Sequence, residues 1–111
     1  MKNYLLLFRG GLVQDKSPEL WQQHMLDWKN WMDELGMSGK LTGGQQLKQD
    51  GRVMTKEKKQ IIDKPYAEAK EIVGGFLTLN ADSQKEAIEI AKGCPIFKVD
   101  GTCEVAEIIQ N

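Results

Sequence analysis

Histidine and cysteine are scarce in this chain of 111 residues, which contains one histidine and two cysteines. Cys94 and Cys103 do not form a Cys-x-x-Cys pair, and the histidine is not at zinc-ligand spacing from them, so the sequence predicts no metal site. A small secreted domain held together by disulfide bonds would carry more cysteines. We therefore expect both thiols to be reduced.

An excess of charge of either sign is also missing. The chain has 15 Lys and Arg residues against 16 Asp and Glu residues, which gives no overall attraction to nucleic acid or to an anionic membrane surface. The apolar run at residues 4–8 is too short for the core of a signal peptide or for a membrane span. These features favour a cytoplasmic protein that has neither nucleic acid nor a membrane as its partner.

Motifs for phosphate binding and for nucleophilic hydrolysis are absent. The glycine pairs at residues 10–11, 43–44 and 74–75 lack the Gly-x-Gly-x-x-Gly and Walker spacings, so they indicate turns and strand entries. Ser38 and Ser83 have no nucleophile motif around them. The composition, 41% hydrophobic and 28% charged, is that of one soluble globular domain, which we expect to span residues 1–111.

The first strand and the first helix have the clearest signals. Residues 3–9 are apolar on both faces, which predicts a central strand that is covered on two sides. Ser17 predicts the N-cap of a helix with Pro18 at its first position, and this helix should end near Gly36. The residues of its apolar face, within an arc of about 140°, are Leu20, Trp21, His24, Met25, Trp28, Trp31, Met32 and Leu35.

The rest of the chain predicts short strands and one further full helix. Ser83 and Glu86 form a capping box for a helix that should end at Gly93. Turn signals occur at residues 43–44 and 50–51. The predicted strands are residues 45–49, 52–55, 59–62, 76–81 and 102–109, and residues 67–72 predict about one turn of helix.

This order of elements predicts an α+β fold, a ferredoxin-like antiparallel sheet with two helices on one face. The opposite sheet face would then be open, although residues 4–8 and 76–81 carry apolar side chains on both faces. A second copy of the chain is the simplest cover for such a face. We therefore expect a homodimer in which two sheets stack as a dimeric α+β barrel.

His24 is the first candidate for chemistry, because it is the only histidine and lies inside the apolar arc of the first helix. Partial burial would lower its pKa and favour the neutral imidazole, which suits acid–base work near neutral pH. The alternative is a buried polar residue that is bonded to a backbone carbonyl. Asp63 is the second candidate: it would orient the imidazole as the acid of a triad does, or cap the turn that follows it.

Aromatic residues of the first helix could line a pocket, although stripes at helical spacing usually pack in the core. Trp28, one turn after His24, is the best candidate for a pocket wall.

The ordered pattern of the whole chain resembles the YCII-related family, in particular its DGPF branch. The pieces that carry the resemblance are residues 4–7, His24, Trp28, Leu35, residues 43–45, 63–71, 74–76, 81–83, 86–87, 93–95 and 104–108. The resemblance implies a ferredoxin-like, dimeric α+β barrel and a His–Asp site, here at His24 and Asp63. The chain departs from the family's name motif, because it has Lys64 and Tyr66 where that motif has Gly and Phe.

The function we expect is that of a small dimeric enzyme or binding protein, with no cofactor, that uses a partly apolar cleft. His24 would act as acid and base, Asp63 would orient it, and Trp28 with Tyr66 would line the cavity. A small aromatic or carbonyl-bearing metabolite that undergoes elimination or proton transfer would suit this pair. The alternative is a non-catalytic interaction or regulatory module with a structural histidine and no cavity beside it. Haem binding through His24 is a third hypothesis.

Overall fold

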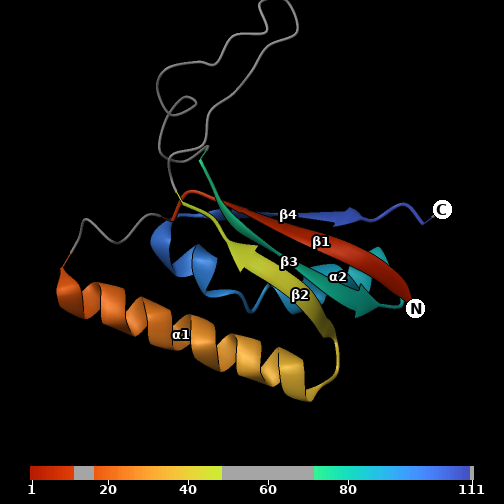
Figure 1. Ribbon diagram of the computed structural model, residues 1–111, viewed down its shortest axis with the longest axis horizontal. Helices are drawn as coiled ribbons and strands as arrows, with labels where there is room; N and C mark the ends of the chain where they lie inside the picture. Colours follow the sequence, from red (N-terminus) through yellow and green to blue (C-terminus); the bar gives the residue numbers. More distant parts are fainter. Residues whose placement is uncertain (12–16, 49–71, 111) are drawn as a thin grey trace, which may run out of the picture.

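The computed structural model of the protein describes residues 1–11, 17–48 and 72–110. Four strands, two α-helices and a short 3-10 helix alternate along this part of the chain (Figure 1). In chain order they are β1 (Lys2–Arg9), α1 (Pro18–Met37), β2 (Leu41–Gln46), β3 (Val73–Ala81), α2 (Gln84–Ala91), η2 (Pro95–Val99) and β4 (Thr102–Glu107).

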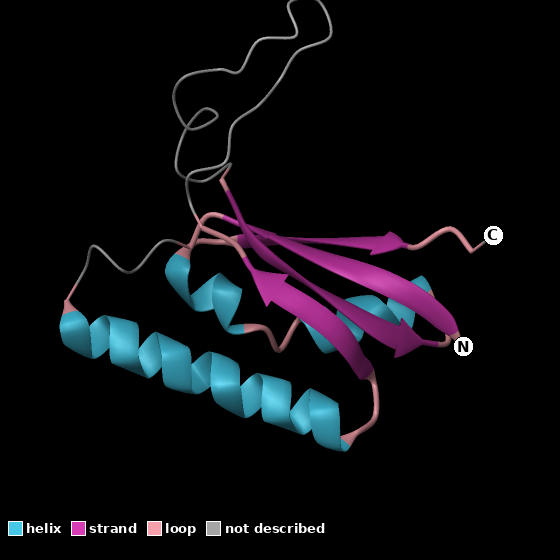
Figure 2. Cartoon of the chain, viewed as in Figure 1, coloured by secondary structure: helices cyan, strands magenta, loops and turns pink. Residues whose placement is uncertain are grey.

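The strands form one antiparallel sheet in the order β2-β3-β1-β4. Both helices and η2 lie on the same side of this sheet (Figure 2). This arrangement confirms the predicted ferredoxin-like α+β fold. Neither α1 nor α2, the two α-helices among the described residues, is both long and apolar enough to cross a membrane.

Strict alternation in the two central strands builds the core. Tyr4 and Leu6 of β1 and Leu79 of β3 are fully buried, and the residues directly before and after each of them point to the other face of the sheet. They pack under α1 and α2 through residues such as Trp31 and Ala87. Full burial of a side chain the size of leucine contributes about 1.5–3 kcal/mol, so these central strands hold the helices in place.

The other face of the sheet carries apolar side chains as well. The register pairs Leu5 with Thr78 and Ala106, and Leu7 with Phe76, so these five residues share one face. We call them the open sheet face, because no helix of the described chain covers it (Figure 2).

The first helix begins where the sequence predicts and ends slightly later. The Ser17 hydroxyl accepts a hydrogen bond from the Leu20 backbone N–H at 3.2 Å, which confirms the N-cap. The helix continues one residue past Gly36 and ends at Met37, near the predicted position. Gly39, with a φ of 75°, adopts the left-handed conformation after the helix, and the next N–H bonds back to Leu35. This is a Schellman ending, and it uses a different glycine from the predicted one.

Two further sequence expectations need correction. Residues 43–44 lie inside β2 and not in a turn, so the strand predicted at 45–49 starts earlier, at Leu41. These glycines fit a strand because a Cβ on Gly44 would lie 2.7 Å from the Phe76 carbonyl oxygen of β3. Ser83 caps α2 as predicted, but the Glu86 carboxylate accepts a hydrogen bond from Lys40.

Several predicted features lie outside the described residues. They are Asp63, Tyr66, the strands at 52–55 and 59–62, and nearly all of the helical turn at 67–72.

Candidate functional site

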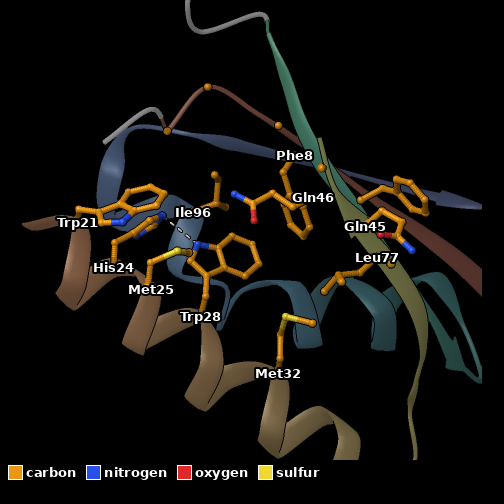
Figure 3. A pocket seen from close by; sticks show the side chains of 16 residues that line it. Phe8, Trp21, His24, Met25, Trp28, Met32, Gln45, Gln46, Leu77 and Ile96 are labelled. Atoms are coloured by element: carbon orange, nitrogen blue, oxygen red, sulfur yellow. Dashed lines mark hydrogen bonds between the residues drawn. The ribbon is translucent and has the colours of Figure 1, made fainter. Parts of the chain in front are cut away.

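A cavity of about 370 Å³ lies between α1, the adjoining ends of the strands and η2. This volume is within the range of pockets that hold small molecules. The cavity is bounded on one side by the apolar face of α1 and on the other by the sheet (Figure 3). Its described lining consists of Phe8, Gly10, Gly11, Trp21, His24, Met25, Trp28, Met32, Gly44, Gln45, Gln46, Gly74, Gly75, Phe76, Leu77 and Ile96.

Glycines make space on the sheet side of the cavity. Gly75 of β3 pairs with Phe8 on one side and with Gln46 on the other. Because paired residues point to the same face of a sheet, a side chain at Gly75 would point toward the helices. No side chain therefore extends from this position into the cavity beneath α1.

His24 lies in the cavity wall and has only 7% of its surface exposed. Its Nε2 atom accepts a hydrogen bond from the indole Nε1–H of Trp28 at 2.9 Å (Figure 3). Burial lowers the pKa of His24 below its usual value, as the sequence predicts for a histidine within the apolar arc. The imidazole is therefore neutral at neutral pH.

Two opposite charges also act on His24. The carboxylate of Asp27 raises the pKa of His24 and the ammonium group of Lys98 lowers it, both more weakly than burial. These two groups form an ion pair of 3.5 Å that joins α1 to η2. Asp27 also accepts a hydrogen bond from Gln23 at 2.9 Å, which lowers the pKa of this carboxylate. Sequence reasoning missed Asp27, although its position three residues after His24 on a helix was a usable signal.

Trp28 is held by edge-to-face contacts with two other aromatic rings. Its ring centroid lies 5.0 Å from that of Phe8, at an interplanar angle of 84°, and 5.6 Å from that of Trp31, at 82°. Such pairs add to the stability that burial provides. Trp28 thus joins the core to the cavity, and Trp31 belongs to the core itself, as expected.

Gln46 is a second residue that sequence reasoning missed. Its pairing with Gly75 places it on the same sheet face as the buried Phe8, whereas Gln45 pairs with Phe76 on the other face. Figure 3 accordingly shows the Gln46 side chain extending toward Ile96 and Trp28, while Gln45 points away. A carboxamide can donate and accept hydrogen bonds. With His24, it is the polar side chain best placed to orient a ligand.

Thiolate and metal chemistry find little support among the described residues. Burial raises the pKa of Cys94 to about 12 and that of Cys103 to about 11, so both free thiols are protonated at neutral pH. Within residues 1–11, 17–48 and 72–110, no three His, Cys, Asp or Glu side chains are grouped to hold a metal ion.

The structure brings two of the four predicted site residues together, His24 and Trp28. The other two, Asp63 and Tyr66, lie outside the described residues, so the pairing of His24 with Asp63 stays a prediction. The described carboxylate that acts on His24 is that of Asp27.

Comparisons with known proteins agree with the fold. A solved structure of 5-chloro-2-hydroxyhydroquinone dehydrochlorinase (TftG) from Burkholderia phenoliruptrix AC1100, in complex with 2,5-dihydroxybenzoquinone, is similar to this chain. The TM-score is 0.54 and the sequence identity 15%, and the match covers 98% of this chain and 95% of the other. No curated protein sequence matches the chain. The model of the YCII-related domain matches residues 12–110, and the chain therefore belongs to the YCII-related family.

Proposed function

We propose that this protein is a small-molecule enzyme that uses His24 as an acid–base group on a planar ring with hydroxyl or carbonyl oxygens. The reaction class is proton transfer or elimination, in which His24 takes a proton from the ligand. Asp63 accepts the Nδ1–H of the imidazole and orients it, as the acid of a triad does. The observation that carries the proposal is a neutral, buried imidazole in the wall of a cavity of about 370 Å³.

The lining of the cavity supports a ring-shaped ligand. Its described side chains include no Asp, Glu, Lys or Arg, and the apolar ones come largely from aromatic residues and methionines. Trp28 and Tyr66 form the aromatic walls in this proposal, and the Gln46 amide binds a second oxygen of the ligand. The dehydrochlorinase that shares the fold is in complex with 2,5-dihydroxybenzoquinone, a ring of this kind.

The proposal includes a homodimer that forms through the open sheet face, in a single domain in the cytoplasm. Leu5, Leu7 and Phe76 are only partly buried in the described chain, and a second sheet stacked on them would remove this apolar surface from water. Sedimentation of the full chain tests this part: a monomer at micromolar concentration would contradict it.

Calorimetric titration of the full chain with 2,5-dihydroxybenzoquinone and with hydroquinone tests the function. We expect at least one of them to bind, and His24→Ala to weaken that binding about tenfold, the effect of losing one hydrogen bond of about 1.4 kcal/mol. Gln22→Ala, on the exposed side of the same helix, is the matched control and should bind as the parent does. Equal binding by the parent and by His24→Ala would remove His24 from the site.

The alternative, a non-catalytic module with a structural histidine, has one observation in its favour. The Trp28 hydrogen bond satisfies His24 Nε2 without any ligand. This alternative also predicts no cavity beside His24, whereas His24 lines one. Under it, His24→Ala lowers the stability of the fold and leaves the binding of both ring compounds unchanged.

A further inference from the structure

We infer that Trp28 is a positioning residue that decides which nitrogen of His24 is free to accept a proton. An indole N–H can only donate a hydrogen bond, and the Trp28 Nε1 atom lies 2.9 Å from His24 Nε2. Nε2 is therefore the acceptor, and the neutral imidazole carries its proton on Nδ1. Free histidine in water favours the other tautomer, so this hydrogen bond reverses an intrinsic preference.

The surroundings of Trp28 keep its N–H directed at His24. The two residues are four apart on α1, which places their side chains one turn apart on the same face. The rings of Phe8 and Trp31, 5% and 9% exposed, contact the indole edge-to-face at centroid distances of 5.0 and 5.6 Å. Rotation of the indole would disturb both contacts, so the N–H has little freedom to turn away.

The charged groups near His24 do not make this choice. Asp27 on α1 and Lys98 on η2 are the described charges that act on the imidazole, and their effects on its pKa are opposite. Their side-chain hydrogen bonds go to each other and to Gln23, not to either ring nitrogen of His24. Among the described residues, Trp28 alone has a hydrogen bond to the imidazole ring of His24.

This inference deepens the proposed function, on which its chemical consequence rests. A ligand hydroxyl that reaches His24 must displace the indole N–H from Nε2. The ligand O–H bond then breaks, a new N–H bond forms at Nε2, and the ligand keeps the electron pair as an oxyanion. The released Trp28 N–H lies beside that oxyanion and donates to it, so the loss of one hydrogen bond is offset where negative charge develops.

Nitrogen-15 NMR of the ligand-free full chain tests the assignment directly. The chain has one histidine, so the imidazole gives one set of long-range proton–nitrogen correlations. Well above the pKa of His24, we expect the shift of a protonated nitrogen at Nδ1 and of an unprotonated one at Nε2. Trp28→Phe keeps an aromatic ring but removes the donor, so the share of the Nε2–H tautomer and the pKa of His24 should both rise, even with Asp63 accepting from Nδ1 as proposed. Trp21→Phe, which removes another indole from the same cavity, is the matched control and should change neither.

A second measurement needs no variant. Protonation of Nε2 removes the acceptor, so the indole proton resonance of Trp28 in the parent should follow the titration of His24. Three results would overturn the inference. They are a proton on Nε2 of the neutral imidazole in the parent, an indole resonance of Trp28 that does not change as His24 titrates, and equal changes of tautomer and pKa in Trp28→Phe and Trp21→Phe. The predicted tautomer in a chain that binds neither ring compound supports the role of Trp28 and refutes only the proposed function.

Discussion

Replacement of Gly75 by alanine tests whether β2 and β3 can lie this close together beneath the cavity only because residue 75 has no side chain. A Cβ built on Gly75 lies 2.8 Å from the Gln45 carbonyl oxygen and 3.4 Å from the Gln46 Cα atom. Both contacts are with the backbone of β2, which cannot rotate away as a flexible side chain can. The methyl group of Gly75→Ala must therefore move β2 away from β3 at the wall of the cavity.

The neighbouring glycine provides a matched control. A Cβ built on Gly74, also in β3, has no atom within 4 Å, and neither glycine has a positive φ. Gly74→Ala should therefore stabilise the fold by about 0.4–1 kcal/mol, because alanine restricts the unfolded chain. Gly75→Ala combines the same gain with an overpacking cost of about 1–3 kcal/mol.

Urea unfolding of the parent and both variants measures the difference. We expect Gly75→Ala to unfold at a lower urea concentration than Gly74→Ala, with a difference in the free energy of unfolding of about 1–3 kcal/mol. In Gly75→Ala, the amide protons that form hydrogen bonds between β2 and β3 should also exchange faster with solvent. Equal stability of the two variants, within about 0.3 kcal/mol, would refute the close approach of the backbones at Gly75.

Two further predictions concern the cavity. Burial holds the pKa of His24 below its value of 6.5 in the unfolded chain, so its contribution to stability is complete above pH 6.5. This stabilisation is lost as the pH falls below that value, by at most about 1.4 kcal/mol per pH unit. The free energy of unfolding of His24→Gln, measured in urea, should lack this component of the pH dependence. The same pH dependence in His24→Gln and in the parent would contradict the burial of His24. Gln46→Leu should weaken binding of the ring compound that the parent binds and Gln45→Leu should not, because the Gln46 side chain points into the cavity and the Gln45 side chain points away from it. Equal affinities of the two variants in calorimetry would exclude the contact.

The sequence predicted the parts of the fold that depend on local chemistry. Ser17 and Ser83 mark the starts of the two α-helices because their hydroxyls satisfy N–H groups of the first turn. The period of the apolar residues on the first helix placed His24 on its buried side, and the lowered pKa follows from that placement. The order of the elements then left the ferredoxin-like topology as the simplest solution.

The structural roles of the glycines were the hardest to predict from the sequence. Residues 43–44 resemble a turn signal, but they lie in β2, where the backbone of β3 approaches Gly44 too closely for a side chain. The end of the first helix depends on Gly39, although Gly36 is also a glycine and lies near the same end of the helix. Local sequence does not distinguish a glycine that turns the chain from one that admits a neighbour, since the neighbour comes from elsewhere in the chain.

The chain by itself determined that a lone histidine would be buried on an amphipathic helix next to a tryptophan. Only the tertiary structure decided that this face would border a cavity and that Gln46 would face it. Those outcomes depend on the register between β2 and β3 and on the close approach of these two strands at Gly75. The physical reason is that helix periodicity acts over a few residues, whereas strand register is set by partners distant in sequence.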